Sequence, residues 1–479
     1  MQIIGILAII ASLLYIGFIV KLIFNIIMTY NNCNPIKTVG WIFAVFFFPV
    51  IGVIVYIVVG RNLRKKSSLF ERLRNDIRQR KHKPSFGFKI EEQARTAKDH
   101  KELKLLLSHL SQLPIFPGNK IDFFTDGQDK FDSLLADIEG ARNHIHVLYY
   151  TLGAGEIGTR LKDMLIKKHR EGVEVRILYD AVGSNETPEK FLKEYKEAGI
   201  AIDAFSPISP PRILHRINYR NHKKIVVIDG KIGYTGGMNV KDEYVKGLSW
   251  GKWRDVHVRI EGPGAQGLQS VFFTDWYYVY KEYLGCERYF PVVEQYGDNP
   301  LQIATSEPLG EHRNIMEGMI QAIMRAKKSI YIVTPYFVPT DSILTAIQAT
   351  AMSGIEIHFV MPDRSDNPKV GYASNSYVQQ LLVSHVKVYR YTDGFIHSKL
   401  MVIDDKITIV GSSNMDIRSF DLNFETSLFI YNEEAAYKAK QIILEDISNS
   451  RPMNLEEWNK RSTFQEFKEA FFRLFSPFL

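Results

Sequence analysis

The chain has 479 residues, more than one ordinary domain holds, and 46% of them are apolar, enough for a large core. Its formal net charge of +7 suits anionic lipid head groups or nucleic acid, and equally an ordinary solvated surface. Two cysteines exclude a disulfide framework and favour a reducing compartment, and without a CxxC or HExxH pair we predict neither a metal site nor a cofactor.

Two apolar runs open the chain. Residues 3–28 carry one charge, Lys21, and residues 36–59 carry one, Lys37, so each run is long enough to cross a bilayer as a helix. A cleavable signal peptide is the alternative for the first run, but the run lacks a basic n-region and an A-x-A site, and a second run follows at once. We therefore predict a transmembrane helical hairpin over residues 1–60.

Basic residues mark one side of this hairpin. Residues 61–66 hold four of them, whereas the loop 29–35 between the runs holds none. Because basic residues gather on the cytoplasmic side of a membrane, where they also suit anionic lipids, we predict that both ends of the hairpin are cytoplasmic. Residues 61–115 are polar and charged, and we interpret them as a basic juxtamembrane linker that is partly helical.

Helices alternate with strands from about residue 121, and the pattern occurs twice. The predicted helices cover 131–141, 158–170, 314–326 and 342–352, and the predicted strands cover 144–151, 173–179, 329–335 and 355–361. This alternation indicates an α/β fold. A repeat of domain length predicts two tandem domains related by a pseudo-twofold axis, which we place at residues 116–300 and 301–479.

Each half ends in the same motif, H-x-K-x4-D-x6-G-x-x-N. One short match would be weak, but two extended copies that close matching halves are no coincidence. The predicted catalytic residues are His222, Lys224 and Asp229 in the first copy and His397, Lys399 and Asp404 in the second. The predicted phosphate-binding residues are Lys224, Lys399, Asn239, Asn414 and Ser412.

The spacing of the motif suits a phosphodiester. A histidine and a lysine two residues apart on a strand project from the same face. The lysines and amides can neutralise phosphoryl oxygens. One imidazole can attack phosphorus, and the other can protonate the leaving alcohol and deprotonate the incoming one, so this chemistry requires no metal.

Four carboxylates accompany the two motifs. Asp229 and Asp404 fall at strand ends, seven residues after their histidines, and we interpret them as acceptors that hold the turn. Asp255 and Glu425 lie at comparable distances after the two motifs and are the predicted partners that orient the histidines. The alternative for Asp255 is an ordinary salt bridge, for example with Arg254.

These residues resemble the phospholipase D superfamily, whose duplicated motif they match over roughly residues 115–450. Within it, "GGMNVKDEY", "DIRSFDLNFE" and the apolar N-terminal segment resemble bacterial cardiolipin synthases. The resemblance implies two tandem phospholipase D-like domains in an enzyme of the bacterial inner membrane. It also implies that His222 forms a phosphatidyl-histidine, that His397 protonates the leaving glycerol, and that two phosphatidylglycerol molecules yield cardiolipin reversibly.

Other functions stay open from the sequence. A membrane phospholipase D hydrolase that releases phosphatidic acid would use the same residues. The two apolar runs weigh against a nuclease, so the predicted partners are phosphatidylglycerol and an anionic lipid surface, not nucleic acid. The C-terminal stretch 464–479 is rich in phenylalanine and is either an interfacial helix or a helix packed on the catalytic domain. The oligomeric state is not predicted.

Overall fold

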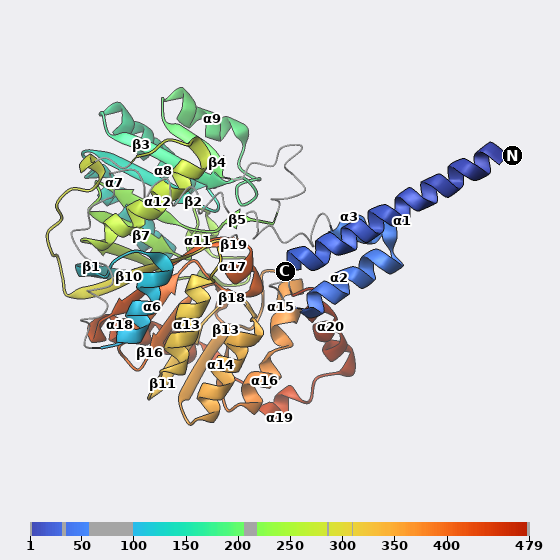
Figure 1. Cartoon of the computed structure of the whole chain (residues 1–479). Helices are drawn as coiled ribbons and strands as arrows, with labels where there is room; N and C mark the ends of the chain where they lie inside the picture. The colour runs from blue at the N-terminus through green and yellow to red at the C-terminus, as the bar shows by residue number, and fades with distance from the viewer. Residues whose placement is uncertain are drawn as a thin grey trace. The chain divides into compact units, whose positions relative to one another are not determined.

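The computed structural model describes residues 2–30, 35–56, 99–205, 218–284, 287–308 and 310–476 (Figure 1). The chain divides into two units, and each is described by itself. The first unit holds the N-terminal helices, and the second, here called the body, holds both sequence motifs.

The N-terminal unit consists of α1 (Gln2–Tyr30), α2 (Pro35–Phe47) and α3 (Pro49–Val55). Ile26, Val45 and Tyr56 form its small buried core. No helix within the described ranges combines the length and the apolar character of a membrane span, so the predicted transmembrane hairpin is not confirmed. The last residues of the second apolar run, 57–59, and residues 61–98 of the predicted linker lie outside the described residues.

The body is built on one sheet of 16 strands, in which the two halves repeat the same strand order. In the first half the order is β4-β3-β2-β6-β7-β9-β1, and in the second it is β14-β13-β11-β16-β17-β19-β10. The first-half strands are β1 (Phe116–Phe124), β2 (His144–Tyr149), β3 (Glu174–Asp180), β4 (Ala201–Phe205), β6 (Ile225–Ile228), β7 (Ile232–Gly236) and β9 (His257–Glu261). The second-half strands are β10 (Asn299–Ser306), β11 (Ser329–Val333), β13 (Glu356–Pro362), β14 (Lys387–Tyr391), β16 (Leu400–Ile403), β17 (Ile407–Gly411) and β19 (Asn423–Tyr431).

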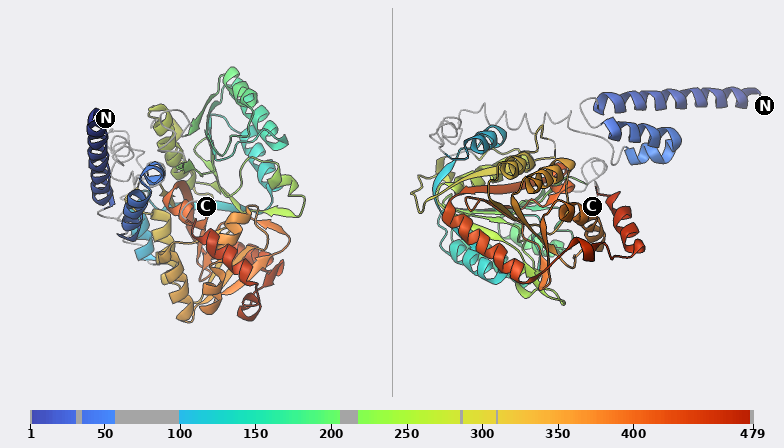
Figure 2. Two further views of the ribbon diagram at one scale, coloured as in Figure 1. Left: turned by 90° about the vertical axis from the view of Figure 1, so that its right-hand side faces the viewer. Right: turned by 90° about the horizontal axis from the view of Figure 1, so that it is seen from below.

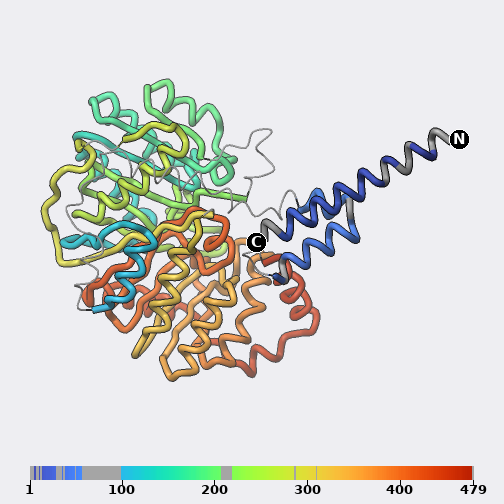
Figure 3. The backbone as a smooth tube through the Cα atoms, viewed as in Figure 1, coloured from blue at the N-terminus to red at the C-terminus, as the bar shows by residue number. Residues whose placement is uncertain are grey.

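The halves meet at β1 and β10, which pair antiparallel with Phe116 opposite Leu301. In the first half β2, β3 and β4 pair parallel, and in the second half β11, β13 and β14 do. The two halves therefore have the same strand arrangement when the strands are counted outward from the central pair. Figure 1 shows the first half in cyan and green and the second in yellow to red, and Figure 3 traces the backbone through both. The predicted α/β fold of two tandem halves is therefore confirmed.

Helices cover the strands on both sides (Figure 2). The first-half helices are α7 (Gly127–Glu139), α8 (Glu156–Arg170), α9 (Glu189–Glu197), α11 (Glu243–Lys246) and α12 (Gly264–Tyr280). Those of the second half are α13 (Asn314–Met324), α14 (Asp341–Met352), α15 (Pro368–Asn375), α16 (Val378–Val383), α17 (Ile417–Asp421), α18 (Glu433–Ser448), α19 (Leu455–Trp458) and α20 (Thr463–Arg473). The predicted helices and strands are found within a few residues of their expected bounds.

The strands are buried on both faces because they separate different cores. In β6, Val226 and Ile228 belong to the core under α7 and α8, whereas Ile225 and Val227 belong to a core beside α12 and α18. The second of these cores also takes residues from the second half, such as Val402. A core shared in this way ties the two halves together.

Part of the predicted linker is a helix of the body. α6 (Lys101–Ser111) buries Leu103 and Leu107 in the core of the second half. From β10, the Gln302 amide donates to the Lys104 carbonyl and to the Ser108 hydroxyl, both at 3.0 Å. The predicted boundary between residues 300 and 301 falls inside β10. The predicted domain limits remain predictions.

Candidate active site

Each motif histidine enters the site on a strand that pairs with the other half. β5 (Arg220–Asn221) runs parallel to the start of β19, and the amide of His222 donates to the Phe424 carbonyl at 2.9 Å. Likewise β15 (Gly394–Ile396) runs parallel to β8 (Lys252–Arg254), and the amide of His397 donates to the Arg254 carbonyl at 2.6 Å. This strand pairing therefore places each histidine beside a carboxylate of the opposite half.

The histidine–carboxylate pairs are crossed. His222 Nδ1 lies 3.0 and 3.1 Å from the two carboxylate oxygens of Glu425, and His397 Nδ1 lies 2.7 Å from Asp255 Oδ2. Both carboxylates are fully buried. Because a carboxylate only accepts, each contact holds the proton on Nδ1 and leaves Nε2 with a lone pair.

The sequence predicted Asp255 and Glu425 as partners of the histidines but not their crossing. The alternative salt bridge between Asp255 and Arg254 does not form. Arg254 instead donates to Asp446 at 2.9 Å and to Glu445 at 2.8 Å.

The two lysines are buried beside the histidines. Lys224 Nζ donates to the carbonyl of His222 at 2.6 Å, and Lys399 Nζ donates to the carbonyl of His397 and lies 2.8 Å from its Nδ1. Burial lowers the pKa of Lys224 to about 7 and that of Lys399 to about 8, although Glu425 and Asp255 raise both. A buried ammonium is costly unless an anion accompanies it, so two of them favour an anionic ligand.

The charges of the two motifs act on each other. Burial lowers the pKa of His222 to about 4, against the opposing charge of Glu425, and Lys224 and Lys399 lower it further. Burial and Lys399 lower the pKa of His397. Burial raises the pKa of Glu425, but the His222 and Lys224 interactions outweigh it and the net shift is downward. The pKa of each histidine is thus shifted by charges from both halves.

The two asparagines close the motifs differently. Asn239 Oδ1 accepts from the amide of Thr151 at 3.1 Å, and its Nδ2 donates to the Tyr244 hydroxyl at 3.2 Å. Asn414 Nδ2 donates to Asp416 Oδ2 at 3.0 Å, and its buried Oδ1 has no hydrogen-bond partner among the described residues. Both side chains keep a small accessible fraction, as the histidines do.

Ser412 makes a different contact from the phosphate binding predicted for it. Its hydroxyl donates to Glu425 Oε2, so its single proton serves the carboxylate and not a ligand. The matching residue of the first motif is Gly237, where an added Cβ would lie 2.1 Å from Asp255 Oδ1. At these equivalent positions the second half has a hydroxyl that binds Glu425. The first half has no side chain there, which leaves room for Asp255.

Asp229 and Asp404 point away from the histidines and cap a neighbouring strand. Asp229 accepts from the amides of residues 142, 143 and 144 at 2.7–2.9 Å, at the start of β2. Asp404 accepts in the same way from the amides of residues 327, 328 and 329, at the start of β11. Each begins a two-residue turn in the left-handed region, Asp229-Gly230 and Asp404-Asp405.

Aromatic rings surround the imidazoles, and the sequence reasoning missed them. The Tyr150 ring lies 5.0 Å from His222, and the rings of Trp253 and Tyr336 lie 5.6 and 6.2 Å from His397. Tyr150 and Tyr336 fall just after β2 and β11, within the two segments that match between the halves. An aromatic residue at the end of the same strand in both repeats was the available signal.

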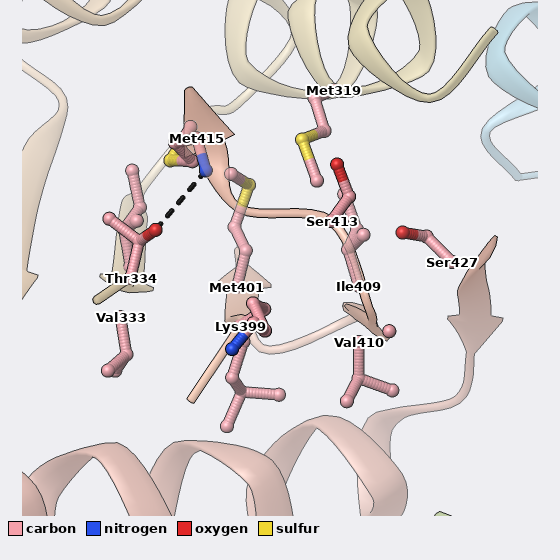
Figure 4. Close-up of a pocket in the computed structure, with 13 residues that line it drawn as sticks. Met319, Val333, Thr334, Lys399, Met401, Ile409, Val410, Ser413, Met415 and Ser427 are labelled. Carbon is pink, nitrogen blue, oxygen red and sulfur yellow. Dashed lines mark hydrogen bonds between the residues drawn. The ribbon is translucent and has the colours of Figure 1, made fainter. Parts of the chain in front are cut away.

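Lys399 is one of the residues that line a small cavity (Figure 4). Its lining includes Val333, Met401, Ile409 and Ser413, and it has a volume of about 10 Å³. The Thr334 hydroxyl accepts from the amide of Met415 at its edge. The cavity has room for about one water molecule and none for a head group, so it is not the substrate site.

Comparison with known proteins identifies the domains. A model described as "Cardiolipin synthase, PLD-like domain" matches residues 134–276 and 319–447, and one described as "Phospholipase_D-nuclease N-terminal" matches residues 13–61. The chain is 39% identical to the major cardiolipin synthase ClsA of Bacillus subtilis, over 98% of this chain and 99% of that protein. It is 38% identical to cardiolipin synthase 1 of Staphylococcus epidermidis, over 98% of each.

A solved structure shares the fold. Phosphatidylserine synthase of Haemophilus influenzae matches with a TM-score of 0.62 over 79% of this chain and 100% of that one, at 14% identity. At that identity the likeness concerns the fold alone. The domain model covers more than half of the chain, and relatives of nearly equal extent share more than a third of its residues. The chain therefore belongs to the cardiolipin synthase family of the phospholipase D superfamily.

Proposed function

We propose that this chain is a cardiolipin synthase, which transfers a phosphatidyl group between two phosphatidylglycerol molecules and releases glycerol. The observation that carries the proposal is the crossed pairing, in which a buried carboxylate of one half holds the histidine of the other. The names of the full-length relatives support the choice of product.

The first half-reaction forms a covalent intermediate. Nε2 of His222 attacks phosphorus of the donor lipid, and the bond from phosphorus to the glycerol oxygen breaks. His397, protonated at Nε2, gives its proton to that oxygen. Although burial lowers the pKa of His397, a bound phosphodiester anion favours its charged form. Glu425 and Asp255 stabilise the two imidazolium rings, as the carboxylate of a catalytic triad does.

The second half-reaction reverses these roles. A head-group hydroxyl of the second lipid loses its proton to His397 and attacks phosphorus, and the bond to His222 breaks. Lys224 and Lys399 stabilise the charge on the phosphoryl oxygens in both steps, with Asn239 and Asn414 as neutral donors. The same steps run backward, so the transfer is reversible.

Purified protein in phosphatidylglycerol vesicles tests this function. We expect cardiolipin and free glycerol in equal amounts, and a phosphatidyl group trapped on His222 when the reaction is quenched with acid-free denaturant. His222→Ala should give neither product. Phosphatidic acid as the sole lipid product would instead identify a hydrolase, the alternative that uses the same residues.

We further propose that residues 1–60 anchor the enzyme in the inner membrane as a helical hairpin with both ends in the cytoplasm. The two apolar runs and the basic residues at 61–66 support this topology. The chain supplies its own reporters, because Cys33 lies in the predicted outer loop and Cys286 in the catalytic region.

A membrane-impermeant thiol reagent applied to intact bacterial cells tests the topology. We expect it to modify Cys33 and to spare Cys286 until the membrane is solubilised. The reverse pattern, or protection of both cysteines in intact cells, would contradict the proposed orientation.

A further inference from the structure

The C-terminal helix α20 carries an exposed apolar stripe. Large apolar side chains recur along one face and reach into solvent, with exposed fractions of 69% for Phe464, 64% for Phe467, 44% for Phe471, 74% for Leu474 and 42% for Phe475. Single exposed apolar residues are ordinary, but three on one short helix and two directly after its end form a patch of the kind that marks an interaction site. Figure 1 shows α20 at the edge of the second half.

The opposite face of α20 is attached to the body. Phe472 stacks on Tyr372 of α15 with ring centroids 5.5 Å apart. Glu469 is buried, pairs with Arg461 and accepts from the Gln465 amide at 2.8 Å. The sequence left open whether this segment packs on the body or faces a membrane. The packed face is narrow, and the phenylalanine-rich face points outward.

One cation, Lys468, borders the stripe, and a second, Arg473, packs on the body at the end of α20. Lys468 Nζ lies 5.0 Å from the ring centroids of both Phe464 and Tyr372, and the Arg473 guanidinium lies 4.3 Å from that of Tyr377. Within the described part of the chain neither cation has a carboxylate at ion-pair distance. A twofold contact between two such faces would bring like charges together, whereas a bilayer of anionic lipid offers both acyl chains and phosphate groups.

We propose that α20 docks the catalytic body on an anionic bilayer, with its phenylalanine stripe in the interfacial region and Lys468 among the phosphates. The proposal rests on the proposed function, because it supplies the surface from which the lipid substrates enter. It concerns a second contact with the membrane, distinct from the N-terminal hairpin.

A cavity lies next to this contact. It has a volume of about 270 Å³, and its lining includes Tyr372, Arg390 and Pro335. Tyr372 is the residue on which α20 packs, and the residue after Pro335 is Tyr336, whose ring faces His397. Open α/β sheets bind ligands at the carboxyl ends of their strands. β13 ends at Pro362, which also lines this cavity. A head group that enters beside α20 therefore meets a cavity adjoining the candidate active site.

A fluorescent probe on α20 tests the proposal without reference to turnover. The full chain with Cys33→Ser and Cys286→Ser receives one new cysteine, Phe467→Cys, labelled with the fluorophore NBD and reconstituted in phosphatidylglycerol vesicles. We expect emission at shorter wavelength than that of the matched control in the same vesicles, and quenching by spin labels on the lipid acyl chains. The matched control is Lys193→Cys on α9, where the native side chain is 69% exposed, and it should show neither effect.

Other outcomes overturn the proposal. A probe at residue 467 that behaves like the control means that α20 faces water. Emission that shifts without acyl-chain quenching, and that reverts when the protein is diluted with empty vesicles, means that the stripe meets a second copy of the chain. Turnover of the wild-type chain is measured separately, so failure of docking and failure of the proposed function remain distinguishable.

Activity provides a second measurement. Phe467→Ser combined with Leu474→Ser should lower kcat/KM on phosphatidylglycerol vesicles by roughly tenfold, with the same thermal stability. Val383→Ser, at a residue that is exposed on α16, is the matched control and should leave kcat/KM unchanged. An unchanged kcat/KM in the double variant would contradict docking through α20.

Discussion

The carboxylate behind each histidine decides which nitrogen is available for chemistry. Glu425 accepts from Nδ1 of His222, and the Ser412 hydroxyl fixes one of its oxygens. A carboxylate in this position both sets the tautomer and stabilises the imidazolium that forms during transfer. An amide of the same shape can donate as well as accept and carries no charge. It therefore neither fixes the tautomer reliably nor stabilises the imidazolium.

Glu425→Gln should therefore lower kcat by roughly 10³- to 10⁴-fold while the protein keeps its fold. The measurement is the rate at which the phosphatidyl-enzyme accumulates in a single turnover. Glu445→Gln changes a carboxylate whose side chain is 59% exposed and should leave that rate unchanged. Normal accumulation in Glu425→Gln would remove Glu425 from the catalytic machinery.

The buried lysines predict an alkaline limit to activity. Burial lowers the pKa of Lys224 to about 7, so in the free enzyme its ammonium is lost as the pH rises through that value. Because the neutral amine cannot neutralise a phosphoryl oxygen, its formation should lower kcat/KM as the pH rises above about 7, in addition to the loss of the His397 proton, whose pKa burial and Lys399 lower. On the acid side kcat/KM should fall as His222 becomes protonated near its lowered pKa of about 4.

The alkaline limb also reports the crossed contact. Glu425 raises the pKa of Lys224, so Glu425→Gln should move the limb to lower pH, whereas Glu445→Gln should not. The pH profile of kcat/KM for each variant checks this. A limb near the ordinary lysine value of about 10.4 would show that burial does not lower the pKa of Lys224.

At the scale of elements, Asp229 and Asp404 hold the hairpin of each motif to the neighbouring parallel strand. Asp229→Ala leaves three amides at the start of β2 without their acceptor. We expect the free energy of unfolding to fall by about 2 kcal/mol, since water replaces part of the lost bonding, and kcat/KM to stay within about threefold. Thermal denaturation in detergent measures the first and vesicle turnover the second.

The control for this change is Asp163→Ala, because that side chain is 67% exposed and its nearest ion pair spans 3.9 Å. It should leave the thermal midpoint unchanged. A loss of turnover in Asp229→Ala at a temperature where the protein is folded would assign Asp229 to the chemistry instead.

Sequence patterns predicted these elements well where their periodicity is strong. The strands at His144–Tyr149 and Ser329–Val333 and the helices beside them follow from apolar spacing alone. The two-residue strand β5 and the three-residue strand β15 are too short to carry a period, and their partners lie about 200 and 140 residues away. The crossed pairing depends on those strands, so the sequence predicted the two histidines and the two carboxylates but not which carboxylate contacts which histidine.

At the scale of the whole molecule, the halves form one structural unit. The sheet is continuous through β1 and β10, and residues of both halves share a core beside α12 and α18. α6, which lies before the first half in the chain, buries Leu107 against the second half. The body is thus organised around the join between its halves, and the histidines reach their carboxylates across that join.

A single shared site makes a prediction that two independent sites do not. If each motif were a complete site, His222→Ala and His397→Ala would each keep about half of the activity, and only the double variant would be inactive. In a shared site each histidine acts in every turnover. Each single variant should then lose nearly all activity, and the double variant should be no worse, because groups that act as a unit are not additive.

The measurement is kcat/KM on phosphatidylglycerol vesicles for both single variants and the double variant. We expect losses of about 10⁴-fold or more for each, equal within about threefold. His109→Ala, at an exposed residue of α6, controls for the loss of an imidazole as such and should retain full activity. Half-activity in either single variant, or losses that multiply in the double, would separate the two motifs into sites that work alone.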